Sequence, residues 1–481
     1  MTSSRLLISI LLLVVYIIAG TMLALRYRSR AGRDARQFYI AGGRLSGVLS
    51  ALTYAATTYS TFMIVGLVGF TYFTGTGALG FEIMYLIATL ALLVTIGRRV
   101  WILSRGRGWV SPGEMLSDFY GSRRVAALAS LVFLISLIPY AGAQLKAVGE
   151  AVAGLADGGD QYYILGVALG AIVMLVWSIA AGIWSVASTD ALQGLWMLAS
   201  SILLLFWLIY EAETAGLGIT GVFRALDNVG LYGIGEFWKP HVFAAFTIPW
   251  MFFAVTNPQV VQRLYMPESK KAYARMVALF GFFGLLYTLI VTLIGVLARG
   301  LAESNTLSIP VGEGIDTVTP ALLSIAHPLL AAMVFTSIVA AGVSTVDSIL
   351  LALASSVERD LLRTENAQKY RTLTIIIVLA AMSSIALLRL EFIVLLSVLS
   401  SFMLLSLAPA TIAGALGVRA KPELVELSII LGPITAIAGI LYYGSPKSLF
   451  VASAAGIPIS GILLLVSSLV LALGVQKARA S

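Results

Sequence analysis

An acid and three hydroxyls interrupt the apolar segment "AAGVSTVDSILLALASSVERDLLR", residues 340–363. Ser344, Thr345, Asp347 and Ser348 fall in the middle of its expected helix, where positions 344 and 348 share one face. Hydroxyl, carbonyl and carboxylate oxygens are the ligands that hard cations prefer. The alternative is that the hydroxyls bond back to their own helix or join neighbouring helices. For the whole cluster with its acid, we favour a cation site.

The chain around this cluster is unusually apolar. Its 481 residues are 59% hydrophobic and only 11% charged, against about 25% charged in soluble domains. Apolar runs of roughly 20 residues, the length needed to cross a bilayer as a helix, recur along the whole chain. Backbone polar groups in lipid must be satisfied within the segment, so runs of this length predict helices. We therefore expect an all-α polytopic membrane protein.

The residue inventory argues against enzymatic chemistry. Cysteine is absent, which excludes disulfides and thiolate catalysis. The two histidines, His241 and His327, fall near the expected outer ends of spans. No nucleotide-binding loop, zinc-ligand spacing or Ser–His–Asp set is present. We predict that the chain has no catalytic residues and is not an enzyme.

The apolar runs predict about 13 transmembrane helices in one transmembrane domain that takes up residues 1–481, since no connection is long enough for a separate soluble domain. The expected spans are 5–25, 46–73, 77–97, 125–153, 162–184, 188–210, 241–265, 274–298, 328–357, 372–389, 391–417, 424–443 and 448–474.

Lysine and arginine give the orientation of these spans. All but seven of the 31 fall on the side reached after each odd-numbered span. By the positive-inside rule, the N-terminus lies outside and the C-terminus in the cytoplasm of a plasma-membrane protein. This distribution accounts for the net charge of +8. We expect membrane lipid as a partner, no nucleic acid, and no obligatory protein partner.

Ionisable residues within spans cost about 2.5–3.5 kcal/mol each and mark functional positions. Lys146 and Glu150 are four residues apart, so they are expected to form a local ion pair. Asp190 and Asp347 lie at a similar inner depth, and no cation is expected beside either. Each must then be protonated or accompany a bound ion.

Two spans are expected to be broken in their middle. The span 46–73 carries four consecutive polar residues, Thr57 to Ser60, and the span 241–265 contains Pro249 and Pro258. Proline removes a backbone donor and clashes with the preceding turn. Interrupted helices at corresponding positions of two halves mark the substrate site of many secondary transporters.

These two spans are five apart, which predicts two five-helix repeats with the second inverted in the membrane. The first repeat would be 46–240 and the second 241–417, preceded by an extra helix and basic loop in 1–45 and followed by two helices in 418–481.

Five motifs occur in order along the chain: "FYIAGGR", "GLVGFTYFTG", "AAGIWSVASTDALQG", "NPQVVQRLYMPESKKAYAR" and "AAGVSTVDSILLALASSVERDLL". Together they resemble the sodium:solute symporter family, which is built on the leucine-transporter (LeuT) fold with an extra N-terminal helix. The resemblance covers nearly the whole chain. It implies a 5+5 inverted repeat and a sodium-coupled symporter that imports a small organic solute by alternating access, with Na⁺ as the co-transported ion.

The resemblance also implies ligands for sodium. The first Na⁺ would be held by the carbonyls of Ala56, Tyr59 and Ala341 and the hydroxyls of Ser344 and Thr345. Some family members hold a second sodium deeper, which maps here onto Asp190, Asp347 and Ser348.

The solute is expected beside the two broken spans. The expected contacts are Thr57, Ser60, Tyr140, Gln144, Trp250, Phe253 and Asn257. The local sequence looks most similar to members that carry monocarboxylates or amino acids, with pantothenate-like solutes as the alternative. A proton-coupled symporter that uses Asp190 and Asp347 as proton carriers remains a second alternative.

Overall fold

The computed structural model describes residues 2–28, 34–156, 159–180, 182–309, 314–363, 367–389, 392–443 and 459–479. Within these ranges the regular elements are all helical, and the only bridge between extended segments is an isolated contact of Leu45 with Pro267. This confirms the predicted all-α class.

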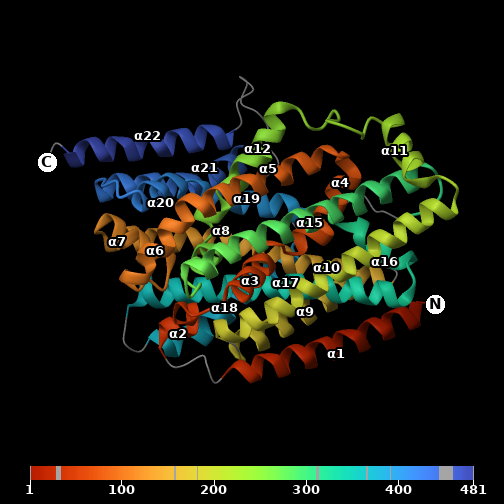
Figure 1. Cartoon of the computed structure of the whole chain (residues 1–481), viewed down its shortest axis with the longest axis horizontal. Helices are drawn as coiled ribbons and strands as arrows, with labels where there is room; N and C mark the ends of the chain where they lie inside the picture. Colours follow the sequence, from red (N-terminus) through yellow and green to blue (C-terminus); the bar gives the residue numbers. More distant parts are fainter. Residues whose placement is uncertain are drawn as a thin grey trace.

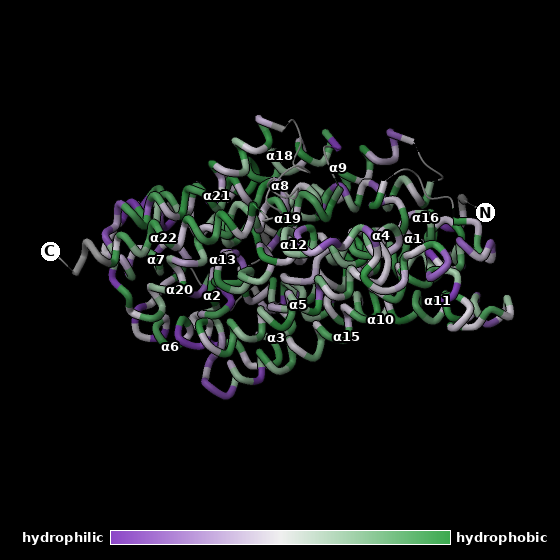
Figure 2. Tube along the Cα trace, turned by 90° about the horizontal axis from the view of Figure 1, so that it is seen from above, coloured by the Kyte–Doolittle hydropathy of each residue, from purple (hydrophilic) through white to green (hydrophobic). Residues whose placement is uncertain are grey.

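The helices run along the long axis of the molecule, and the two termini lie at opposite ends (Figure 1). Hydrophilic segments gather toward these two ends, while the middle is mostly hydrophobic (Figure 2). This distribution is the one expected for a protein whose long axis crosses a bilayer, with polar ends in the headgroup regions.

Eight continuous helical segments in the described part are long and apolar enough to span a membrane. They are α1 (Thr2–Arg28), α5 to α6 (Gly77–Arg107), α8 (Arg123–Leu155), α9 (Asp160–Ala180), α10 (Ile183–Thr214), α15 (Lys270–Glu303), α17 with its terminal π-helix (Pro328–Leu362) and α21 (Pro422–Tyr443).

Two bent pairs add two further spans. The helix α3 (Gly47–Thr58) meets the π-helix Phe62–Leu67 and α4 (Val68–Thr74) at 50°, and α19 (Ile393–Leu405) meets α20 (Ala408–Ala415) at 49°.

The other expected spans correspond to shorter helices. The span 241–265 forms α12 (Pro240–Met251), α13 (Phe253–Thr256) and α14 (Pro258–Arg263), and the span 372–389 forms α18 (Arg371–Leu387). The last span is represented by α22 (Ile459–Arg479), and the earlier part of its range lies outside the described residues. The total of 13 spans therefore stays a prediction.

Short helices cap the two ends of the bundle. They are α2 (Ala35–Ile40), α7 (Pro112–Tyr120), α11 (Gly218–Asn228) and α16 (Val318–Ile325). The start of α7 has a capping box, in which the Ser111 hydroxyl accepts the backbone N–H of Glu114 and the Glu114 carboxylate accepts that of Ser111.

The breaks in the two predicted spans have local causes. Helix α3 ends at Thr58, and Tyr59 leaves the helical region with φ −91° and ψ 95°. In the other span Asn257 is extended, with φ −83° and ψ 116°, because a residue before proline is disfavoured in the helical region. Pro258 then opens α14, where its missing N–H costs nothing.

Helix α17 is buried along most of its length and contacts α1, α8 and α10. Helix α3 packs against α10 and α15, and the short α14 contacts both α3 and α17. The packing therefore brings the first break, the second break and the hydroxyl-rich face of α17 into one region.

Candidate functional site

The end of α3 meets the hydroxyl face of α17. The hydroxyl of Ser344 lies 2.9 Å from the Ala56 carbonyl and 3.0 Å from the Ala341 carbonyl. The hydroxyl of Thr345 lies 3.5 Å from the carbonyl of Thr57. The last carbonyls of a helix have no partner within the helix, so the break in α3 makes the oxygens of residues 56 and 57 available.

Three of the five oxygens predicted for the first sodium, those of Ala56, Ala341 and Ser344, are therefore neighbours. Thr345 adjoins them, and Tyr59 lies at the break itself. A hydroxyl can donate to a carbonyl or turn a lone pair toward a cation. This set of neutral oxygens therefore fits Na⁺ as a ligand type.

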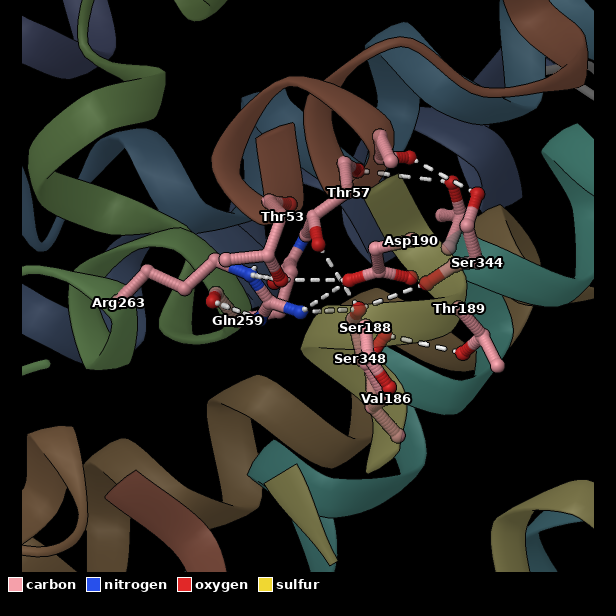
Figure 3. A network of polar contacts seen from close by, with 12 residues as sticks. Thr53, Thr57, Val186, Ser188, Thr189, Asp190, Gln259, Arg263, Ser344 and Ser348 are labelled. Carbon is pink, nitrogen blue, oxygen red and sulfur yellow. Dashed lines mark hydrogen bonds and ion pairs between the residues drawn. The ribbon is translucent and has the colours of Figure 1, made fainter. Parts of the chain in front are cut away.

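A second polar cluster lies close by, around Asp190 (Figure 3). The Asp190 carboxylate accepts a 2.5 Å hydrogen bond from the Thr53 hydroxyl. Its Oδ2 also lies 3.3 Å from Nη2 of Arg263, and both side chains are only 1% exposed. The expectation that no cation lies beside Asp190 was wrong. Arg263 was counted with the basic residues of the inner side, at the end of the expected span 241–265, but α14 carries it into the interior.

The same guanidinium reaches another residue predicted for the second sodium. Nη2 of Arg263 donates to the Ser348 hydroxyl at 2.5 Å, and Ser348 in turn donates to the Ser344 carbonyl at 2.6 Å. Asp347 is also buried, at 2% exposure, on α17, which packs against α1. Arg263 thus contacts two of the three residues predicted for a second sodium.

The residues predicted for solute on α3 and α8 surround the first break. The Gln144 carbonyl oxygen accepts the backbone N–H of Thr61 at 3.1 Å and its hydroxyl at 2.7 Å. Tyr140 donates to the Ser60 hydroxyl at 3.3 Å. These bonds satisfy backbone and side-chain groups that the break would otherwise leave unpaired.

Trp250 and Phe253 form an aromatic wall at the second broken span. Their rings stack with centroids 5.1 Å apart, and Phe62 and Tyr85 contact Trp250 at 5.2 and 5.5 Å. The indole N–H of Trp250 and the hydroxyl of Tyr85 are buried and have no hydrogen-bond partner within the described chain.

Two other predicted solute contacts differ in their surroundings. Asn257 lies at the second break and its side-chain carbonyl faces the Thr256 hydroxyl at 3.4 Å. The hydroxyl of Thr57 contacts Ser348 at 2.8 Å, so it belongs to the cluster of Asp190 and Arg263.

Nothing in the sequence assigned three other residues of this region to the ion or solute site. Arg263 lacked any local signal other than its place at the end of an apolar run. Glu82 is 2% exposed on α5 and lies three residues before Tyr85 on the same helix. Both amide atoms of Gln259 are buried and make no hydrogen bond within the described chain.

The expected pairing of Lys146 with Glu150 is corrected by the structure. The Lys146 ammonium lies 2.7 Å from Asp316, which also accepts the backbone N–H of Ile393. Glu150 faces Arg389 instead, at 3.9 Å. The ion-pair partner of Lys146 therefore comes from a segment that is distant in the sequence, and not from the next turn of its own helix.

The fold and the site together define a membrane transporter whose broken helices face a hydroxyl-rich helix. The sodium:solute symporter family model matches residues 38–418, so the chain belongs to this family. It is a sodium-coupled symporter, and Na⁺ is its co-transported ion.

Relatives of known function agree with this class. The chain is 23% identical over 372 residues to a sodium/proline symporter of Staphylococcus aureus, which covers 73% of this chain and 67% of that protein. It is 24% identical over 363 residues to a sodium/pantothenate symporter of Haemophilus influenzae, which covers 73% and 72% of the two chains.

A similar fold occurs in a Na⁺-coupled sialic acid symporter whose structure is a substrate-bound outward-open state. The TM-score is 0.79 at 19% identity, with 97% of this chain and 98% of that chain covered. At this identity the match shows the shared fold. It agrees with the predicted LeuT-like architecture.

Proposed function

We propose that the chain imports a small organic solute together with Na⁺, and that the Ser344 face of α17 holds the ion. The observation that carries this assignment is the contact of the Ser344 hydroxyl with carbonyls from two helices, Ala56 of α3 and Ala341 of α17. An ion at this point ties the broken helix to α17. Such a tie favours one arrangement of the bundle and couples ion binding to alternating access.

The proposed sodium ligands are Ala56, Tyr59, Ala341, Ser344 and Thr345. The solute would lie beside the two breaks, against Ser60, Tyr140, Gln144, Trp250, Phe253 and Asn257. No residue of the proposal performs bond chemistry, so the chain acts as a transporter and not as an enzyme.

Buried unpaired groups indicate the kind of solute. Trp250 and Tyr85 offer hydrogen-bond donors, which suit a carboxylate or carbonyl oxygen. Glu82 adds a buried acidic acceptor in the same region. The buried Glu82 carboxyl can accept hydrogen bonds from the ammonium group of an amino acid, which a simple monocarboxylate lacks. We therefore favour an amino acid over a simple monocarboxylate.

A pantothenate-like solute is the second candidate. It also combines a carboxylate with hydrogen-bond donors, and a sodium/pantothenate symporter is among the relatives. Thr58, whose buried hydroxyl has no partner within the described chain, stands where the resemblance implies an acid in proline-transporting members. This difference argues against simple proline transport.

The sodium gradient supplies enough energy for accumulation. One Na⁺ gains about 2.3 kcal/mol from a membrane potential of 100 mV and about 1.4 kcal/mol from a tenfold gradient. The sum of about 3.7 kcal/mol corresponds to roughly 500-fold accumulation of solute per sodium.

Orientation and repeats complete the proposal. The N-terminus would lie outside and the C-terminus in the cytoplasm of the plasma membrane, and residues 46–240 and 241–417 would be inverted repeats. The opposite positions of the termini support this arrangement (Figure 1).

The test is uptake of labelled amino acids, monocarboxylates and pantothenate into proteoliposomes with and without an inward Na⁺ gradient. We expect Na⁺-dependent uptake of at least one solute in the native chain and its loss in Ser344→Ala/Thr345→Ala. Uptake that does not depend on Na⁺ and is unchanged by the substitutions would refute the assigned ion site.

A further inference from the structure

A cavity of about 500 Å³ lies at the end of the molecule where α22 ends. It is formed by α6 (Arg98–Arg107), α7 and the end of α20, which lie together in this part of the bundle (Figure 1). The Tyr120 hydroxyl of α7 donates to the Ala410 carbonyl of α20 at 2.7 Å. The Phe119 ring packs against Gly414 so closely that a Cβ would not fit there. Packing therefore fixes the cavity walls, and the cavity size is in the usual range of ligand pockets.

Three arginines and one acid line this cavity. The acid, Asp118, is already engaged, because its Oδ2 lies 2.6 Å from Nη1 of Arg107 and accepts the indole N–H of Trp109 at 2.9 Å. Arg99 and Arg419 make no hydrogen bond or ion pair within the part of the chain that the structure describes. The lining side chains thus carry an excess of two positive charges, and two guanidinium groups are available for an anion.

The two available arginines come from distant parts of the sequence. Arg99 lies in the first turn of α6. Arg419 follows α20, where Gly417 adopts a left-handed conformation with φ +79° and turns the chain after the helix. Guanidinium groups bind phosphate oxygens through parallel N–H bonds, and one phosphate has enough oxygens to accept from both groups. The cavity therefore suits a ligand that contains a phosphate.

Apolar side chains beside the arginines point to the rest of the ligand. Ile102, which lines the cavity, is 51% exposed, and Leu416 at the end of α20 is 45% exposed. Exposed apolar side chains at the edge of a site mark contact with a lipid or with another apolar partner. Free phosphate would use only the arginines, whereas a phospholipid also covers these apolar side chains.

We propose that this cavity binds the headgroup of one anionic phospholipid. Arg99 and Arg419 hold the phosphate oxygens, and the first part of an acyl chain lies along Ile102. In the proposed orientation this end of the bundle faces the cytoplasmic leaflet, where anionic lipids are enriched and where basic pockets between helices bind their headgroups. The lipid thereby joins α6 to the segment after α20. The inference goes beyond the transport function and does not depend on the sodium or solute site.

The test is a titration of the purified full-length chain in detergent with phosphatidylglycerol, followed by native mass spectrometry. We expect one tightly bound phosphatidylglycerol, and weaker binding of phosphatidylcholine, whose choline group cancels the charge of its phosphate. Arg99→Gln/Arg419→Gln should raise the dissociation constant of phosphatidylglycerol about 30-fold, since each basic residue contributes about fivefold. Arg419→Gln alone should raise it about fivefold, and it replaces the double variant if that variant does not fold.

The matched control is Arg98→Gln/Arg124→Gln, which removes two charges from exposed side chains that do not line the cavity. Water and salt screen such charges, so the dissociation constant should change by less than about threefold. An equal loss in both double variants, or equal affinity for the two lipids, would overturn the inference. Displacement of phosphatidylglycerol by an equal concentration of inorganic phosphate would assign the cavity to free phosphate and would also overturn it.

Discussion

Two polar clusters lie on neighbouring turns of α17, and they handle charge in different ways. At Ser344, hydroxyl and carbonyl oxygens meet and no side chain of the cluster carries a charge. At Ser348, the carboxylate of Asp190 and the guanidinium of Arg263 meet as a buried ion pair. The first cluster lacks a positive charge of its own, and the second already contains one.

This difference explains how one helix can serve both binding and stability. Neutral oxygens can bind and release a monovalent ion because little electrostatic energy is stored when the ion is absent. A buried carboxylate without a counterion would be far more costly. In the proposed assignment, the fixed guanidinium would keep the Asp190 cluster assembled while the Ser344 cluster exchanges Na⁺.

The largest expected effect comes from removing the acid of the charged cluster. Asp190→Ala leaves Arg263 buried without its carboxylate, which should lower the free energy of unfolding by about 3–5 kcal/mol. Denaturation of the purified chain in detergent measures this loss. Asp190→Asn, which keeps an oxygen acceptor for Thr53 and Arg263, is the control and should lose less. A loss below about 1 kcal/mol for the alanine variant would mean that the pair does not stabilise the fold.

Substitutions in the neutral cluster around Ser344 should change the affinity for Na⁺ and not the free energy of unfolding. Ser344→Ala/Thr345→Ala removes two hydroxyl oxygens, and we expect the half-saturating Na⁺ concentration for uptake to rise about 10- to 100-fold. The matched control is Thr336→Ala on the same helix, because within the described residues that buried hydroxyl bonds only to the Ala332 carbonyl of its own helix, at 2.9 Å. An equal change in both variants would assign the Ser344 hydroxyls to helix packing.

The contrast between these clusters also marks the limit of sequence reasoning. The oxygen-rich face around Ser344 and the break before Pro258 were predictable, because both follow from local residue types and helical spacing. The partner of Asp190 was not, since Arg263 lies in the last turn of the expected span 241–265 and only tertiary packing brings α14 against α3 and α17. The predicted pairing of Lys146 with Glu150 was wrong for the same reason, because Asp316, which pairs with Lys146, lies 170 residues away along the chain. Ion pairs between residues that are far apart in the chain leave no periodic pattern in the sequence.

A substitution of Glu82 tests whether solute binding is independent of the Ser344 cluster and of the Asp190 cluster. Glu82→Gln keeps the shape but removes the negative charge, and a charge-assisted hydrogen bond is about twice as strong as a neutral one. For an amino-acid solute we expect the KM for uptake to rise about tenfold, while the half-saturating Na⁺ concentration stays unchanged. Transport assays that vary solute and Na⁺ separately give both values. A shift in Na⁺ affinity of the same size would place Glu82 in the ion machinery instead.

The smallest effect on the free energy of unfolding is expected from an ion pair that is exposed to solvent. Arg107 and Asp118 form a shorter pair than Arg263 and Asp190, at 2.6 Å, but their side chains are 47% and 37% exposed. Solvent weakens the attraction several-fold relative to an interior pair, and exposed pairs contribute about 0–1 kcal/mol. Arg107→Gln should therefore lower the free energy of unfolding by no more than about 1 kcal/mol. A loss as large as that of Asp190→Ala would show that burial is not what separates the two pairs.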